Sequence, residues 1–273
     1  MLKKMFGLMT LSITIFFSSQ VNATVVQFQT VLGPFEINLY DQSTQATVAN
    51  FLDYVNSNAY DNVVIHRAVD NFVVQGGGFT YEGTSPLSVV PDNGPVNNEP
   101  EFSNVRGTIA MAKLDGDPNS ATNEWFINLS DNSANLDVQN GGFTVFGEVT
   151  GNGMDVIDAI ENLPLFNFGG ALTSIPLRNY TTQNQTDGVE VTDQHLVLIT
   201  AIVVLDAALD TAANLSPVEN ILIDQVLTTT PASSSGGSGG GGCTVGGDGS
   251  HDPTLPLLLL FSTVYLFRRR YYH

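Results

Sequence analysis

One arginine, Arg67, stands out in the stretch VIHRAVDNFVVQGGGF, residues 64–79, because it lies between an apolar run and a glycine-rich turn. The chain has nine lysines and arginines, and five of them lie at its two ends. The other four are Arg67, Arg106, Lys113 and Arg178. A guanidinium has five N–H donors and stays charged at physiological pH. What Arg67 does in so acidic a chain is therefore the first question that the sequence raises.

The patterns of other common active sites are weak. Residues 24–230 contain only two histidines, His66 and His195, and no cysteine, and neither histidine has a partner at metal-ligand spacing. A Ser-His-Asp hydrolase is conceivable, but the chain has no nucleophile elbow. The run Gly76-Gly77-Gly78 lacks the Lys-Ser/Thr of a phosphate loop, so we expect it to form a tight bend between strands.

The charge of the chain limits its partners. Residues 24–230 hold 25 acidic residues against four basic ones, a net charge of −21. Such a surface repels nucleic acid and anionic membranes, so no nucleic-acid partner is expected. The same residues lack cysteine, and therefore a disulfide, so the fold must depend on a core that about 200 residues can supply.

The elements that must position any site are mainly β. The runs VVQFQT (25–30) and FEINLY (35–40) alternate apolar and polar residues around Gly33-Pro34, which predicts a hairpin. Helices are predicted after a Ser43 or Thr44 cap and over residues 154–162. HLVLITAIVVL, residues 195–205, predicts a long buried strand, and several short β-branched runs lie between. Many short strands with two isolated helices favour a β-barrel over βαβ units.

Four blocks in order resemble the cyclophilins, the peptidyl-prolyl cis-trans isomerases, and most closely their bacterial periplasmic members. They are HRAVDNFVVQGGGF (66–79), RGTIAMA (106–112), SATNEWFINLSDN (120–132) and FTVFGEV (143–149), and the resemblance extends over residues 25–205. It implies a closed eight-stranded antiparallel β-barrel capped by two α-helices, with the site on the outer face. It also implies an enzyme that needs no cofactor.

The resemblance implies a role for Arg67. The X-Pro peptide bond has two populated isomers that exchange slowly, because the nitrogen lone pair is delocalised into the carbonyl. In the twisted state the proline nitrogen becomes pyramidal and can accept a hydrogen bond. Arg67 matches the family's catalytic arginine, whose guanidinium donates that bond without needing a pKa near neutrality. His66 precedes the arginine in the family too, and we interpret it as structural.

The other site residues are matched to the family one at a time. Gln75 matches the glutamine that orients the arginine. Ala112 and Lys113 match the segment that binds the substrate backbone, although Lys113 replaces a common asparagine. The remaining matches form the apolar pocket for the proline ring: Phe72, Val73, Phe126, Leu136 and Phe143.

Two positions depart from the family pattern. Glu124 stands where a glutamine usually hydrogen-bonds the substrate, and strand alternation places Glu124 and Phe126 on one face with Trp125 on the other. An ionised carboxylate cannot donate, and it can attract Arg67 away from substrate. We therefore expect Glu124→Gln to raise activity about tenfold. Asn135 stands where cyclosporin-sensitive relatives have tryptophan.

The two ends of the chain predict export. Lys3 and Lys4, the apolar run 5–17 and the sequence up to Ala23 resemble a signal peptide (1–23), with an uncleaved anchor as the alternative. The predicted isomerase domain spans 24–206, followed by an acidic tail with a Gly/Ser-rich linker (207–250). Residues 251–273 join a short apolar segment to three arginines and resemble a GlyGly-CTERM-type sorting tag that a membrane protease removes, or else a tail anchor.

The sequence therefore predicts a monomeric isomerase that acts on proline-containing exported polypeptides. Its predicted location is the periplasm, tethered at least transiently to the inner membrane, or the cell surface or medium after tail processing. One alternative is a cyclophilin-like peptide-binding module or chaperone with weak or no turnover, which Glu124 favours. A β-barrel ligand carrier is disfavoured, since side chains fill the interior of small barrels.

Overall fold

The first two strands form the predicted hairpin, although the turn differs. The computed structural model describes residues 24–206 and 215–223. In it β1 (Val25–Thr30) pairs antiparallel with β2 (Gly33–Leu39). Gly33 and Pro34 belong to β2 rather than to the loop. The Thr30 hydroxyl accepts from the Leu32 N–H at 3.0 Å and donates to the Gly33 carbonyl at 2.7 Å. The turn therefore consists of Val31 and Leu32, just before the predicted Gly33-Pro34.

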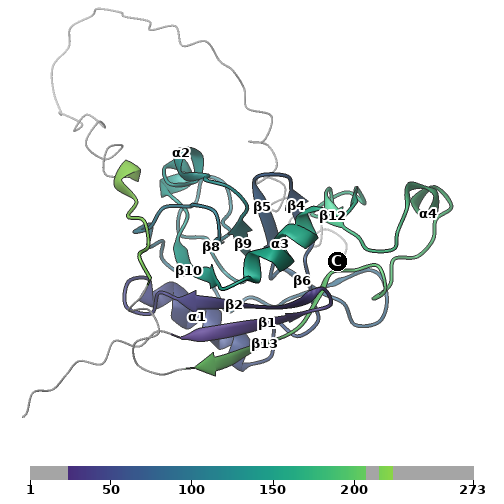
Figure 1. Ribbon diagram of the computed structural model, residues 1–273, viewed down its shortest axis with the longest axis horizontal. Coiled ribbons are helices and arrows are strands. Elements are labelled where there is room, and N and C mark those ends of the chain that lie inside the picture. Colours follow the sequence, from purple (N-terminus) through teal and green to yellow (C-terminus); the bar gives the residue numbers. More distant parts are fainter. Residues whose placement is uncertain (1–23, 207–214, 224–273) are drawn as a thin grey trace, which may run out of the picture.

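Within the described residues, eleven strands form one curled sheet and two more form a small hairpin (Figure 1). The order in the large sheet is β4-β5-β9-β8-β10-β2-β1-β13-β3-β6-β7, and β11 pairs with β12. The remaining strands are β3 (Val63–Val64), β4 (Arg67–Val69), β5 (Val73–Gly76), β6 (Phe79–Thr80), β7 (Ser88–Val89), β8 (Thr108–Met111), β9 (Trp125–Asn128), β10 (Val145–Thr150), β11 (Leu165–Phe166), β12 (Ile175–Pro176) and β13 (Leu198–Asp206).

The fold is mainly β, but the predicted closed barrel of eight strands is not what the described residues form. The large sheet is a half-barrel whose end strands, β4 and β7, each pair with one neighbour. The β-branched run NVVIHR (62–67) divides in two, because β3 pairs with β13 and β6 whereas β4 pairs with β5. At the division, the Ile65 N–H donates to Val197 and the His66 N–H to Gln75. Neighbouring residues of one apolar run thus turn to different partners.

Five helices appear among the described residues, where the sequence predicted two. The two longer ones match the predictions: α1 (Gln45–Asn56) and α3 (Gly153–Glu161). The other three are short and more polar: α2 (Ser133–Leu136), the 3₁₀ helix η1 (Gln139–Gly141) and α4 (Thr182–Thr186). A reciprocal pair of hydrogen bonds between Thr181 and Asn184 begins α4, so local capping forms this helix without an apolar stripe.

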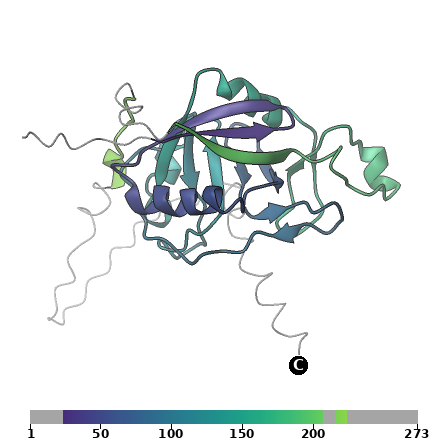
Figure 2. The ribbon, with the colours of Figure 1, turned by 90° about the horizontal axis from the view of Figure 1, so that it is seen from below.

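Helix α1 begins at Gln45, directly after Thr44, one of the two predicted caps, but another residue caps it. The Thr44 side chain makes no cap hydrogen bond. Instead the Glu99 carboxylate accepts from the N–H groups of Ala46 (3.2 Å) and Thr47 (2.9 Å). Figure 2 shows α1 in dark blue lying beside the strands, and its apolar face packs into the main core.

The buried apolar side chains form three clusters. The first and largest lies in the curl of the sheet around Trp125 and Phe28, whose rings meet edge to face at 5.2 Å. The second includes Val73 of β5 and Phe126 of β9, two strands that pair with each other. The third, around Phe166 and Tyr180, lies under the β11–β12 hairpin.

A segment beyond the last strand also packs on the domain. Residues 215–223, predicted as part of an acidic tail, hydrogen-bond to residues 100–103 and to Asp137. No helix within residues 24–206 or 215–223 is long and apolar enough to span a bilayer. The predicted signal peptide, glycine linker and terminal apolar segment lie outside the described residues.

Candidate active site

Strand pairing brings the candidate residues together from separate parts of the chain. Arg67 in β4 lies opposite Gln75 in β5, and Gln75 lies opposite Phe126 in β9. Phe126 in turn lies opposite Ala110 in β8. Because side chains alternate along a strand, these cross-strand partners share one face of the sheet. Trp125 points to the main core instead, as the alternation predicted.

Arg67 is held in place by Gln75. One terminal nitrogen of the guanidinium donates to the Gln75 amide oxygen at 3.0 Å, and Arg67 is only 2% exposed. Its buried Nε has no hydrogen-bond partner among the described residues. Burial lowers the pKa of Arg67 to about 10, while the charge of Glu124 opposes that shift. The group remains a cation at neutral pH, with donor capacity to spare.

Glu124 does face the site, but it binds Gln75 rather than Arg67. The Gln75 amide nitrogen donates to the Glu124 carboxylate at 2.8 Å. The same carboxylate lies 3.5 Å from the His66 ring nitrogen, which makes an ion pair only if His66 is protonated. No ion pair is found between the side chains of Arg67 and Glu124, both of which belong to the described part of the chain. A carboxylate only accepts, so it turns the Gln75 oxygen toward Arg67.

An apolar group that we call the pocket cluster lies beside this polar chain. Phe126 and Phe143 meet edge to face at 5.8 Å, and Phe72 packs against the cluster while partly exposed. The structure thus gathers all five apolar residues that the sequence assigned to a proline pocket, together with Ala112. The buried members are Tyr40, Val73, Ala110, Ala112, Phe126, Leu136, Phe143 and Val145.

A tight turn presents Phe72 to the pocket cluster. Asn71 has a positive φ of 53°, a conformation that asparagine tolerates better than most residues. The Phe72 N–H donates to the Val69 carbonyl at 3.0 Å, and the Asn132 amide donates to the Phe72 carbonyl at 2.9 Å. The sequence showed Asn132 within a matching block but did not indicate this supporting role.

The Lys113 side chain folds back against Phe143 of the pocket cluster. Its amine donates to the carbonyls of Asn140 and Gly142 and lies 4.6 Å from the centre of the Phe143 ring. Burial lowers the pKa of Lys113 to about 8, with Asp117 opposing the shift. The Lys113 ammonium group thus has its partners within the protein. The Ala112 N–H donates to the Glu124 backbone carbonyl at 2.9 Å.

The glycine run has the predicted structural role. It links β5 to β6, and Gly77 has a φ of +93°. A Cβ on Gly77 would lie 2.3 Å from the Asn123 carbonyl, and one on Gly78 would lie 2.5 Å from the Glu124 carboxylate. The glycines therefore allow the backbone to approach the Glu124 side chain closely.

The sequence did not indicate the polar support behind the pocket cluster. The buried Asp137 carboxylate accepts from the backbone N–H of Asn104 at 2.7 Å and from its side-chain amide at 3.0 Å. That amide also donates to the Phe143 carbonyl at 3.2 Å. Only the polar character of Asp137 directly after Leu136 could have suggested a buried anchor.

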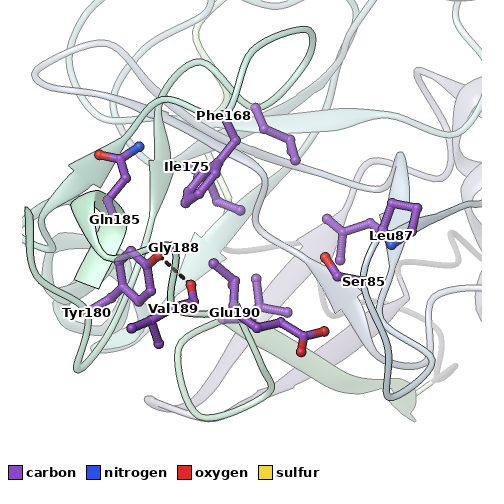
Figure 3. Close-up of a pocket in the computed structure, with 13 residues that line it drawn as sticks. Ser85, Leu87, Phe168, Ile175, Tyr180, Gln185, Gly188, Val189 and Glu190 are labelled. Atoms are coloured by element: carbon purple, nitrogen blue, oxygen red, sulfur yellow. Dashed lines mark hydrogen bonds between the residues drawn. The ribbon is translucent and has the colours of Figure 1, made fainter. Parts of the chain in front are cut away.

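A separate cavity of 320 Å³ lies away from these residues, under the β11–β12 hairpin (Figure 3). Leu172, Ile175 and Tyr180 line it, and none of the candidate site residues does. The Tyr180 hydroxyl donates to the Val189 carbonyl at 2.7 Å across its wall. The cavity is therefore a feature of the third cluster and not part of the site around Arg67.

The site contains a fixed cation beside the apolar pocket cluster, and this arrangement limits its chemistry. No three potential metal-binding side chains gather in the parts of the chain that the structure describes. Arg67 can donate hydrogen bonds but is a poor proton donor at neutral pH. The arrangement suits an apolar ring bound beside an atom that accepts a hydrogen bond.

Comparison with known proteins gives a family for this geometry. The sequence profile of the cyclophilin-type peptidyl-prolyl cis-trans isomerase/CLD family matches residues 25–182. The chain is 39% identical to a peptidyl-prolyl cis-trans isomerase of Acinetobacter baylyi over 147 residues, covering 54% of this chain and 76% of that protein. It is 41% identical to isomerase A of Dickeya dadantii over 151 residues, with the same coverage. It is 38% identical to isomerase B of Escherichia coli over 143 residues, 51% of this chain and 85% of that protein.

Proposed function

The chain belongs to the cyclophilin-type peptidyl-prolyl cis-trans isomerase family, and we propose that Arg67 is the catalytic residue with which it accelerates rotation about X-Pro bonds. The single observation that carries this assignment is the buried hydrogen bond from Arg67 to Gln75 beside the pocket cluster. It leaves the guanidinium charged, oriented and able to donate to substrate.

In this mechanism the proline ring enters the pocket cluster and the preceding carbonyl rotates. Twisting ends the delocalisation of the nitrogen lone pair, so the nitrogen becomes a hydrogen-bond acceptor in the transition state only. Arg67 donates to that nitrogen and therefore binds the transition state more tightly than either planar isomer. Apolar contacts with Phe126 and Phe143 hold the ring while the rest of the peptide moves. Rotation breaks no covalent bond, so the mechanism transfers no proton and requires no cofactor.

Replacing Arg67 tests the mechanism. We expect Arg67→Ala and Arg67→Lys to lower kcat/KM for a proline tetrapeptide about a hundredfold or more, or about 2.7 kcal/mol of transition-state stabilisation. Arg178→Ala removes an arginine that donates to the Leu196 and Asp193 carbonyls, away from Arg67, and it should leave turnover unchanged. Circular dichroism would confirm that each variant is folded. Turnover near the wild-type level in folded Arg67 variants would refute the assignment.

We further propose that the substrates are exported polypeptides. The predicted signal peptide and sorting tag support export to the periplasm or beyond. The alternative of a peptide-binding module has a distinct outcome in the same experiment: calorimetry would detect binding of a proline peptide, but the wild-type protein would not accelerate isomerisation. The hydrogen bond that Gln75 donates to Glu124 weakens that alternative, since Glu124 does not withdraw Arg67 from the site.

A further inference from the structure

Residues 215–223, which we call the C-terminal strap, lie beyond residue 182, where the family match ends. They return to the domain beside residues 100–103 (Figure 1, yellow-green). The Ser103 N–H donates to the Val218 carbonyl and the Asn220 N–H to the Glu101 carbonyl, both at 2.8 Å. Phe102 and Glu219 thus form an antiparallel bridge. The strap adds a short extended pairing to the domain.

Asn220 is the main polar contact of the strap. It is 5% exposed, and its side-chain amide donates to the carbonyls of Asp137 at 2.9 Å and Pro100 at 3.2 Å. Its side-chain oxygen accepts from the N–H groups of Leu222 and Ile223, each at 3.1 Å. One buried side chain therefore orders the end of the strap and joins it to two separate parts of the domain.

The strap is connected to the pocket cluster in two places, through Asp137 and through Leu215. Asp137 directly follows Leu136, and Asp137 binds Asn104, which binds the Phe143 carbonyl. The Phe143 N–H in turn donates to the Leu136 carbonyl at 2.9 Å, so these residues form one connected network. Leu215, at the other end of the strap, packs directly against the cluster, as does Phe102. The strap thus supports the wall that carries Leu136 and Phe143.

We infer that Asn220 is a positioning residue for the prolyl pocket, acting through Asp137, so that the strap sets how tightly the enzyme holds its proline ring. The inference rests on the proposed function only for the measurements of kcat and KM, and not for the measurement of peptide binding. A pocket wall that holds the ring equally in ground and transition states affects KM and leaves kcat unchanged.

The test compares strap variants of the full-length protein. Asn220→Ala removes every side-chain bond of Asn220, whereas Asn220→Asp keeps the acceptor for Leu222 and Ile223 and loses the two donor bonds. Both should raise KM, and the Kd of a proline peptide measured by calorimetry, about fivefold at unchanged kcat. Ile221→Ala is the matched control, since Ile221 is 63% exposed. All measurements are made well below the melting temperature of each variant.

The outcomes separate positioning from simple stabilisation. A lower Tm with unchanged KM and Kd in the Asn220 variants would mean that the strap only stabilises the fold, and would overturn the inference. If Asn220→Ala fails to fold, Leu215→Ser perturbs the strap at its other end and carries the same expectation. If the wild-type protein lacks turnover, the peptide Kd values still decide the inference, so its failure and that of the proposed function remain distinct.

Discussion

Glu124 is the residue at which the structure most changes the interpretation of the site. The sequence suggested that its carboxylate competes with substrate for Arg67. The carboxylate instead accepts from Gln75 at 2.8 Å, and Gln75 accepts from Arg67 at 3.0 Å. Glu124 therefore supports Arg67 indirectly, by fixing which way the Gln75 amide points.

This geometry changes the prediction for Glu124 variants. Glu124→Ala should lower kcat/KM about tenfold, because Gln75 loses the bond that orients it. Glu124→Gln keeps an acceptor oxygen, so its kcat/KM should stay within about threefold of wild type. Steady-state kinetics at two salt concentrations would decide. A tenfold gain in Glu124→Gln that shrinks at high salt would instead support competition between Glu124 and the substrate for Arg67.

Lys113 makes a prediction about stability and pH. Burial lowers its pKa from 10.5 to about 8 in the folded protein, so between these values the unfolded chain binds more protons. Stability must then rise with pH across this window, since deprotonation removes the cost of a buried charge. Relative to Lys113→Met, the wild-type free energy of unfolding should increase by about 2 kcal/mol from pH 7 to pH 10. Urea titrations of both proteins measure this difference, and a constant difference would contradict it.

Helix α1 shows how a distant segment can replace a local cap. Glu99 accepts from two N–H groups in the first turn and from the Thr47 hydroxyl at 2.8 Å. A carboxylate there is also favoured by the helix dipole. Glu99→Ala should therefore cost about 1–2 kcal/mol of unfolding free energy, whereas Ser43→Ala should change it by less than about 0.5 kcal/mol. Equal losses of unfolding free energy in the two variants, measured by thermal or urea unfolding, would instead support the local cap that the sequence predicted.

The whole chain makes a prediction about processing. The signal-like residues 1–23 and most residues after the glycine linker should be removed, so the mature protein should begin at Thr24 and end near the linker. Intact-mass spectrometry of protein recovered from cells measures both ends. Recovery of the terminal sequence RRRYYH would favour the tail anchor. In either case the strap precedes the linker, so processing there leaves Asn220 in place.

The sequence alone determined the family, the mainly β class and the two longer helices, since these depend on local periodicity and on blocks of adjacent residues. It also named the apolar residues that lie together beside Arg67. It could not determine which backbone groups meet across the fold. Ile65 and His66 turn to different strands, Glu99 caps α1 although 52 residues separate it from Thr47, and Glu124 bonds to Gln75. Asn220, 83 residues from Asp137, supports the pocket wall. Such contacts join residues that no periodicity relates, so only the tertiary structure decided them.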